Sequence, residues 1–112
     1  MVKLKRIYEA PEKSDSFRIL VDRLWPRVVS KKKAALDLWL KDIAPSDALR
    51  KWFGHDTKKW LRFQRKYESE IVANKETFGR LKEIIKKRKN VTLLYASKDE
   101  DHNEAIVIKN LL

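Results

Sequence analysis

Two short apolar runs constrain the fold of this chain more than any other feature. One is NVTLLYAS at residues 90–97, which is rich in β-branched and aromatic residues, and the other is FRILVDRL at residues 17–24. Both have the length and composition of buried strands. The segments between them carry apolar residues at helical spacing, and strands that alternate with helices are typical of the α/β class. The sequence therefore predicts a small, mostly parallel sheet flanked by helices.

The remaining elements follow from turn and capping residues. Ser46 is a good N-cap for a short helix that ends at Gly54, where the left-handed conformation suits glycine. Asp56 is predicted to cap a second helix, whose apolar stripe is Trp60, Phe63, Tyr67 and Ile71. A third helix covers residues 75–89. A strand is predicted at residues 4–8, and an extended segment at 36–43 follows a turn capped by Ser30.

Size and composition exclude several classes of protein. A chain of 112 residues forms one domain, residues 1–112, because about 150 residues is typical of a domain. The chain has no cysteine and only two histidines without metal-ligand spacing, so no disulfide, zinc-cysteine site or other metal site is predicted. With two glycines in the whole chain, no nucleotide-binding glycine loop can form, and no cofactor is predicted. The beginning of the sequence lacks an apolar signal region and no run is long enough to span a bilayer, so we expect a cytoplasmic protein that does not insert into membranes.

The charge balance points to anionic partners. Lysine and arginine exceed aspartate and glutamate by 11 residues. Such a field attracts nucleic acid or phosphorylated small molecules. The alternative is a lysine-rich solvated surface with no partner, because the charge is spread along the chain.

Polar side chains follow both predicted strands. The segment VDRLWPR at 21–27 brings Asp22, Arg23, Trp25 and Arg27, and SKDEDHN follows the other strand at 97–103. Because ligands of open α/β sheets bind outside the carboxyl ends of the strands, we expect both segments to face one cleft. The two arginines could hold an anion and the indole could stack on a ring. The alternative is that these side chains pair within the fold.

His102 is the strongest candidate for acid–base chemistry. The sequence predicts it in the first turn of a terminal helix, with Asp99 beside it and Asn103 after it, and that helix is capped by Ser97 or by Asp99. A neutral imidazole can take up or release a proton near pH 7. The alternative is a histidine that only caps the helix. The second histidine, His55, lies at a helix end and is expected to be structural.

Three blocks of the sequence resemble the YeaO-like family of bacterial and archaeal proteins. They are RILVDRLWPR, DLWLKDIAPSDALRKWFGHD and LLYASKDEDHNEAIVIK, in this order along the chain. The resemblance implies an intracellular α/β domain without an established activity. Its polar motif positions fall here on Asp22, Arg23, Arg27, His55, Asp56, Asp99, His102 and Asn103. Val28 departs from the pattern, which usually has glycine there; if that glycine adopts a positive φ, Val28 is strained.

These observations favour one function and leave two others open. The first is binding of an anionic, phosphate-bearing ligand, a nucleotide or nucleic acid, at the carboxyl ends of the strands. The second is an enzyme that acts on a small anionic substrate, with His102 as general acid or base and Asp99 as its partner. The third is an interaction module in which Trp39, Trp52, Phe53 and Trp60 form a homodimer surface.

Overall fold

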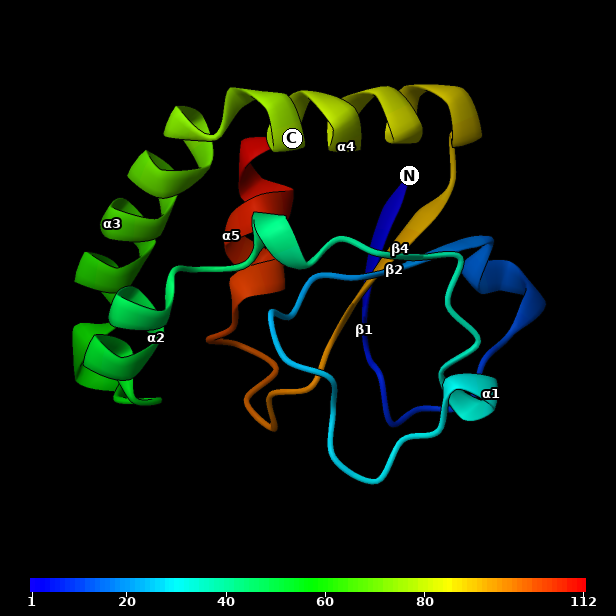
Figure 1. The fold of residues 1–112 in the computed structure, drawn as a ribbon, viewed down its shortest axis with the longest axis horizontal. Coiled ribbons are helices and arrows are strands. Elements are labelled where there is room, and N and C mark those ends of the chain that lie inside the picture. The colour runs from blue at the N-terminus through cyan, green and yellow to red at the C-terminus, as the bar shows by residue number, and fades with distance from the viewer.

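The structure is a computed structural model that describes all 112 residues, and its centre is a sheet of four parallel strands. The strands are β1 (Val2–Arg6), β2 (Phe17–Leu20), β3 (Leu38–Trp39) and β4 (Val91–Tyr95). Their order is β1-β4-β2-β3, so β4 pairs in parallel with both β1 and β2. The predicted parallel sheet is confirmed, and the carboxyl ends of β1, β2 and β4 reach the same edge (Figure 1).

Two strands end earlier than the sequence predicts. The first strand lies two residues before the predicted range 4–8, and β2 ends four residues before the predicted Leu24. Backbone pairing continues for one bond beyond each, from Ile7 to Tyr95 and from Val21 to Leu94. The next residue, Asp22, accepts the N–H of Ala96 with its side chain. Main-chain pairing between β2 and β4 therefore ends at Asp22, where a side-chain carboxylate accepts the hydrogen bond in place of a main-chain carbonyl.

Five α-helices accompany the sheet. They are α1 (Lys31–Ala34), α2 (Asp47–Phe53), α3 (Trp60–Ala73), α4 (Lys75–Arg88) and α5 (Glu104–Leu111), and three short 3₁₀ turns lie at Lys13–Asp15, Lys41–Ile43 and Thr57–Lys59. The hydroxyls of Ser30 and Ser46 cap α1 and α2 as predicted, and Gly54 ends α2 with φ 51°. Asp56 caps the 3₁₀ turn that leads directly into α3.

The start of α5 corrects a prediction. Asn103 is its N-cap and accepts the N–H of Ile106 at 3.2 Å, so His102 lies before the helix rather than in its first turn. Asp99 instead accepts the N–H groups of Asp101 and His102 in the preceding turn. Asn103 is favoured as the cap because its buried amide also donates to the carbonyl of Asp99, and this bond connects the turn to the helix.

The two faces of the sheet are covered differently. Helices α2, α3 and α5 lie on one face, and α4 closes the end at which β4 begins (Figure 1). Phe63, Tyr67 and Ile71 of the predicted α3 stripe are buried there, whereas Trp60 at the end of the stripe is half-buried. The other face carries a smaller cluster of Ile7, Leu20, Ala34 and Leu94, covered by α1 and the loop at 21–37. Parallel sheets usually have helices on both faces, so this second face is thinly covered.

A buried ionic cluster lies on that second face. The carboxylate of Asp15 is 1% exposed and forms ion pairs with Lys3, Lys5 and Arg18. Burial raises the pKa of Asp15, but the N–H of Glu12 and the three cations outweigh burial and lower the pKa to about 2. No buried side-chain nitrogen or oxygen of the chain lacks a hydrogen-bond partner. This cluster is therefore fully satisfied, as buried charges must be in a stable fold.

Candidate functional site

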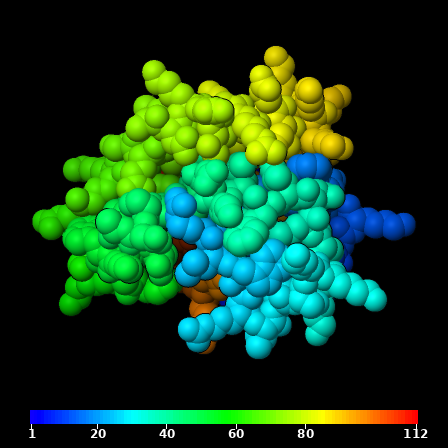
Figure 2. All heavy atoms as spheres, viewed as in Figure 1, coloured from blue at the N-terminus to red at the C-terminus, as the bar shows by residue number.

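Three loops meet at the carboxyl edge of the sheet. The N–H of Ala96 donates to Asp22 at 2.9 Å, which joins the loop after β4 to the loop after β2. Arg6 at the end of β1 donates to the carbonyl of Ser97 at 2.9 Å, and the hydroxyl of Tyr8 donates to the carbonyl of Arg27 at 3.2 Å. Figure 2 shows the loop after β2, in blue, in front of the loop after β4, in orange, at the lower border of the molecule. The segments predicted to face one cleft do lie together.

Two carboxyl groups face each other at this edge. The carboxyl group of Glu104, the first residue of α5, lies close to that of Asp22. Burial, and then the adjacent Asp22, raise the pKa of Glu104 well above its ordinary value. Both side chains nevertheless keep partial exposure. The raised pKa means that burial and the nearby carboxyl group favour the uncharged form of Glu104.

Tyr95 lies at the same edge. Its side chain is buried, and the residue is 4% exposed. Its hydroxyl makes no hydrogen bond within the chain and therefore reaches solvent, since no buried side-chain oxygen is left unpaired. Burial, followed by the nearby charges of Glu100 and Glu9, raises the pKa of Tyr95. The hydroxyl is thus a neutral donor available to a ligand at the carboxyl edge.

Asp99 and His102 form a second pair of titratable groups. The Nδ1 atom of His102 lies 2.9 Å from one carboxylate oxygen of Asp99, and both side chains are about one-third exposed. The N–H of Asp101 and the imidazole of His102 lower the pKa of Asp99 against the smaller opposing effect of burial. The ring of His102 packs edge-to-face on Trp60 at 5.2 Å between centroids. Its position is therefore fixed by a carboxylate and by an indole, which leaves Nε2 for a further partner.

Several predicted ligand-binding side chains bind within the fold. Arg23 donates to the carbonyls of Ala44 and Pro45 at 3.1 and 3.2 Å. The indole N–H of Trp25 donates to the carbonyl of Val29 at 2.7 Å. Arg27 is exposed, and only its carbonyl is used, by Tyr8.

The other predicted residues are spread over the molecule. His55 is exposed, with φ 58°, in the turn between α2 and α3, where Asp56 caps the following 3₁₀ turn. Asn103 is buried as the cap of α5. The backbone of Arg27 contacts Tyr8, whereas the ring of His102 contacts Trp60 of α3, so the two residues have different partners.

Val28 adopts the conformation that a glycine would favour. Its φ is 54° and its side chain is 96% exposed. A β-branched residue in the left-handed region is a genuine outlier, because its Cβ crowds the backbone. The positive φ on which the expectation of strain depends is therefore present at Val28, and the strain itself stays a prediction.

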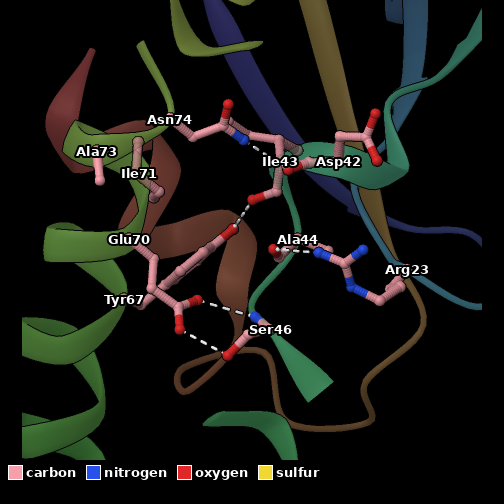
Figure 3. A pocket seen from close by; sticks show the side chains of 10 residues that line it. All are labelled: Arg23, Asp42, Ile43, Ala44, Ser46, Tyr67, Glu70, Ile71, Ala73 and Asn74. Atoms are coloured by element: carbon pink, nitrogen blue, oxygen red, sulfur yellow. Dashed lines mark hydrogen bonds between the residues drawn. The ribbon is translucent and has the colours of Figure 1, made fainter. Parts of the chain in front are cut away.

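A groove with a volume of about 500 Å³ lies between α3 and the segment before α2. Figure 3 shows that its polar groups bind each other. Glu70 accepts from the N–H and hydroxyl of Ser46, and the hydroxyl of Tyr67 donates to the carbonyl of Ile43 at 2.6 Å. These bonds hold α3 to the start of α2 and leave few groups for a ligand.

No cluster of three or more histidine, cysteine, aspartate or glutamate side chains is arranged to hold a metal ion. No helix has both the length and the apolar character needed to cross a bilayer.

Sequence reasoning missed Glu104 and Tyr95. Tyr95 is the last residue of the best predicted strand, so its place at the edge could have been inferred. Glu104 follows the SKDEDHN segment directly, but its contact with Asp22 spans 82 residues of chain and has no local signal.

Comparison with known proteins identifies the family. A family profile described as "Inactive DUF488-N3 subclade" matches residues 1–112. The chain is 41% identical to the uncharacterized protein YeaO of Escherichia coli (strain K12), over 99% of this chain and 96% of that protein. It is 32% identical to the uncharacterized protein Rv3073c of Mycobacterium tuberculosis (strain ATCC 25618 / H37Rv), over 99% of this chain and 92% of that protein. No solved structure matches. The chain therefore belongs to the YeaO-like family, within the subclade described as inactive DUF488-N3.

Proposed function

We propose that this protein binds a small nucleotide-like ligand, with hydroxyl groups and a phosphate, at the carboxyl edge of the sheet. The observation that carries the proposal is the meeting of the loops after β2 and β4, where Asp22 accepts the N–H of Ala96 at 2.9 Å and lies close to Glu104. A fold that needed only packing gains nothing from two desolvated carboxyl groups side by side. A partly exposed carboxyl group with a strongly raised pKa, such as that of Glu104, is typical of functional sites.

The chemistry of the edge suits the two parts of such a ligand. Carboxylate oxygens accept hydrogen bonds from sugar hydroxyls, as they do for the ribose of dinucleotides. Arg27 is exposed on the loop after β2, whereas the guanidinium of Arg6 donates to the carbonyls of Ala96 and Ser97. Guanidinium groups match the geometry of phosphate oxygens. Arg27 therefore takes the phosphate in this proposal, and the carboxyl pair takes the hydroxyl groups.

The description of the family supports binding without turnover. It calls the subclade inactive, and the chain is matched over its whole length. The rival function is an enzyme, which the Asp99–His102 pair favours, because a histidine oriented by a carboxylate is a common acid–base device. In our proposal that pair orients the bound ligand and transfers no proton during a reaction.

The interaction module has less support from geometry. Phe53 and Trp60 stack with Phe63 on one face of the sheet, whereas Trp39 packs against Trp25 on the other. The indole of Trp52 is covered by the ammonium groups of Lys59 and Lys66. These aromatic side chains do not share a surface, and homodimerisation stays a prediction.

A thermal-shift screen tests the proposal. Nucleoside monophosphates, ribose 5-phosphate and inorganic phosphate are added to the protein at low and at high salt. A ligand that binds only the folded state adds about 2.7 kcal/mol to the free energy of unfolding at 100 times its Kd, and so raises the melting temperature. We expect Glu104→Gln and Arg27→Ala to remain folded and to lose most of this shift.

The matched controls lie on α4, where Glu83 and Arg80 are exposed. Glu83→Gln and Arg80→Ala remove the same charges and should keep the full shift. The proposal is wrong if none of the phosphate compounds raises the melting temperature, or if Glu104→Gln responds as the parent does. Product formed from a bound compound, and lost in His102→Gln, would establish the enzyme instead.

A further inference from the structure

A second groove lies on the thinly covered face of the sheet, beside α1. It has a volume of about 230 Å³ and is lined by Trp25, Lys31, Leu36, Asp37, Leu38 and Trp39. It is separate from the carboxyl pair, because none of its lining residues belongs to that pair. The residues that form it come from the loop after β2, from α1 and from β3.

Two indole rings form the walls of this groove. The rings of Trp25 and Trp39 meet edge-to-face, with centroids 5.4 Å apart and planes at 72°. Both indole N–H groups are already used, by the carbonyls of Val29 and Asp22 at 2.7 Å each. The rings are therefore fixed in orientation, and because both are half-buried they still present aromatic surface to solvent.

Positive charge surrounds the groove. Lys31, Lys32 and Lys33 are exposed on α1, and none of their ammonium groups forms an ion pair. The ammonium of Lys41 lies 5.4 Å from the centroid of Trp39. The one carboxylate that lines the groove, Asp37, accepts the backbone N–H of Arg18 at 2.8 Å.

We propose that this groove binds single-stranded nucleic acid, with a base against the indole rings and phosphates beside α1. Proteins that bind single strands combine a basic groove with aromatic side chains on which bases stack. A nucleobase is flat and partly apolar, as the space between the indoles and Leu36 requires, and the lysines neutralise the chain of phosphates that accompanies it. This inference does not depend on the nucleotide site, because it uses different residues.

The probe is a fluorescein-labelled oligodeoxythymidine of about ten nucleotides, within the range of site sizes known for such domains. Binding is measured by fluorescence anisotropy at several salt concentrations. We expect measurable affinity at low salt that falls with salt at a log–log slope of about −0.7 for each phosphate neutralised. Inorganic polyphosphate of similar charge, which has no bases, should compete much more weakly than unlabelled oligodeoxythymidine.

Two triple variants locate the site. One is Lys31→Gln, Lys32→Gln and Lys33→Gln on α1, and its matched control is Lys86→Gln, Lys87→Gln and Lys89→Gln at the far end of α4, where the side chains are equally exposed. Both remove three charges from a surface and should leave the melting temperature near that of the parent. The α1 variant should bind at least ten times more weakly than the α4 control. A third variant, Trp25→Leu, should reduce affinity for the oligonucleotide but not for polyphosphate.

Three results would overturn the inference. They are absence of binding at low salt, equal weakening by the two triple variants, and equal competition by polyphosphate and oligodeoxythymidine. The first removes nucleic acid as a partner, the second leaves only the general field of the molecule, and the third removes the stacking of bases. Each is distinguishable from failure of the nucleotide site, which is tested with Glu104→Gln and Arg27→Ala.

Discussion

The buried carboxyl group of Asp15 is surrounded by three cations, whereas the partly exposed carboxyl group of Glu104 lies beside a second carboxyl group. The pKa of Asp15 is lowered to about 2, while that of Glu104 is raised well above its ordinary value. Burial acts in the same direction on both. The partners decide the sign, because cations stabilise the charged carboxylate and a neighbouring carboxylate destabilises it.

This difference separates a part of the molecule that maintains the fold from a part that is available for function. The cluster around Asp15 links β1 to β2 and has every donor and acceptor satisfied. The Asp22–Glu104 pair is partly exposed, and its surroundings disfavour the charged form of Glu104. Residues kept at a cost to stability are the ones that a functional site is expected to contain.

Asp15→Asn should have the largest effect. The substitution leaves Arg18 buried without its anion and leaves Lys5 with Glu12 alone, and breaking a buried ion pair costs about 3–5 kcal/mol. Denaturation by urea at neutral pH should show a lower midpoint and a free energy of unfolding that is smaller by this amount. Asp47→Asn is the control, because Asp47 forms an exposed ion pair with Arg50 at 3.5 Å and should change stability by less than about 1 kcal/mol.

The pH dependence of the parent protein tests the contribution of Asp15 to stability independently. The pKa of Asp15 is lower in the folded state than its ordinary value of 3.8, so its contribution to stability is complete above that value. The contribution, about 2 kcal/mol, is lost as the pH falls from about 4 to about 2. Loss of stability that is no steeper in the parent than in Asp15→Asn over this interval would show that the cluster is not the source.

Glu104→Gln should have a smaller effect of opposite sign. Because the pKa of Glu104 is raised in the folded state, the unfolded chain loses the proton more readily, and stability falls as the pH rises above the ordinary value of 4.5. Glutamine does not titrate and can donate its amide to Asp22. The variant should be more stable than the parent by about 1 kcal/mol near pH 7, with little difference near pH 4.

Thermal or urea unfolding at both pH values measures this difference. A variant that is less stable than the parent at neutral pH would mean that the carboxyl pair holds the loop after β4 in place. In that case Glu104 belongs with Asp15, and the contrast between the two regions is lost.

The sheet could be predicted from the sequence because strands and helices have local patterns. The apolar run that became β4 was found within two residues at each end, and the caps Ser30, Ser46 and Gly54 were identified from their residue types. Several neighbouring residues can, however, compete to cap one helix. In the segment before α5 the sequence predicts the wrong cap. Asn103 prevails there through a second hydrogen bond that the sequence does not display.

The sequence could predict where the candidate site lies, but not which side chains form it. Parallel strands bring their following loops together, which placed Asp22 and the loop of Ala96 at one edge. Which side chains turn inward depends on contacts between distant segments. Arg23 reaches carbonyls 21 and 22 residues away, and Glu104 meets Asp22 from the far end of the chain. Residue type alone could not separate the inward-turned Arg23 from the exposed Arg27.

Val28→Gly extends the comparison to the backbone and should have the smallest effect. Ser16, beside Asp15, and Val28, in the loop after Asp22, both have positive φ, at 57° and 54°. Serine is small, whereas valine is β-branched and gains no burial, since its side chain is 96% exposed. The left-handed conformation costs valine about 1–2 kcal/mol, and the freedom of glycine in the unfolded chain offsets about 0.5–1 kcal/mol of that gain. Val28→Gly should therefore stabilise the protein by about 0.5–1 kcal/mol in urea denaturation.

Leu24→Gly is the matched control in the same loop, because Leu24 is exposed and its φ is not positive, and it should destabilise by a similar amount. If both glycine variants are less stable than the parent, the loop after β2 stores no strain, and the carboxyl edge differs from the Asp15 cluster in its charges alone.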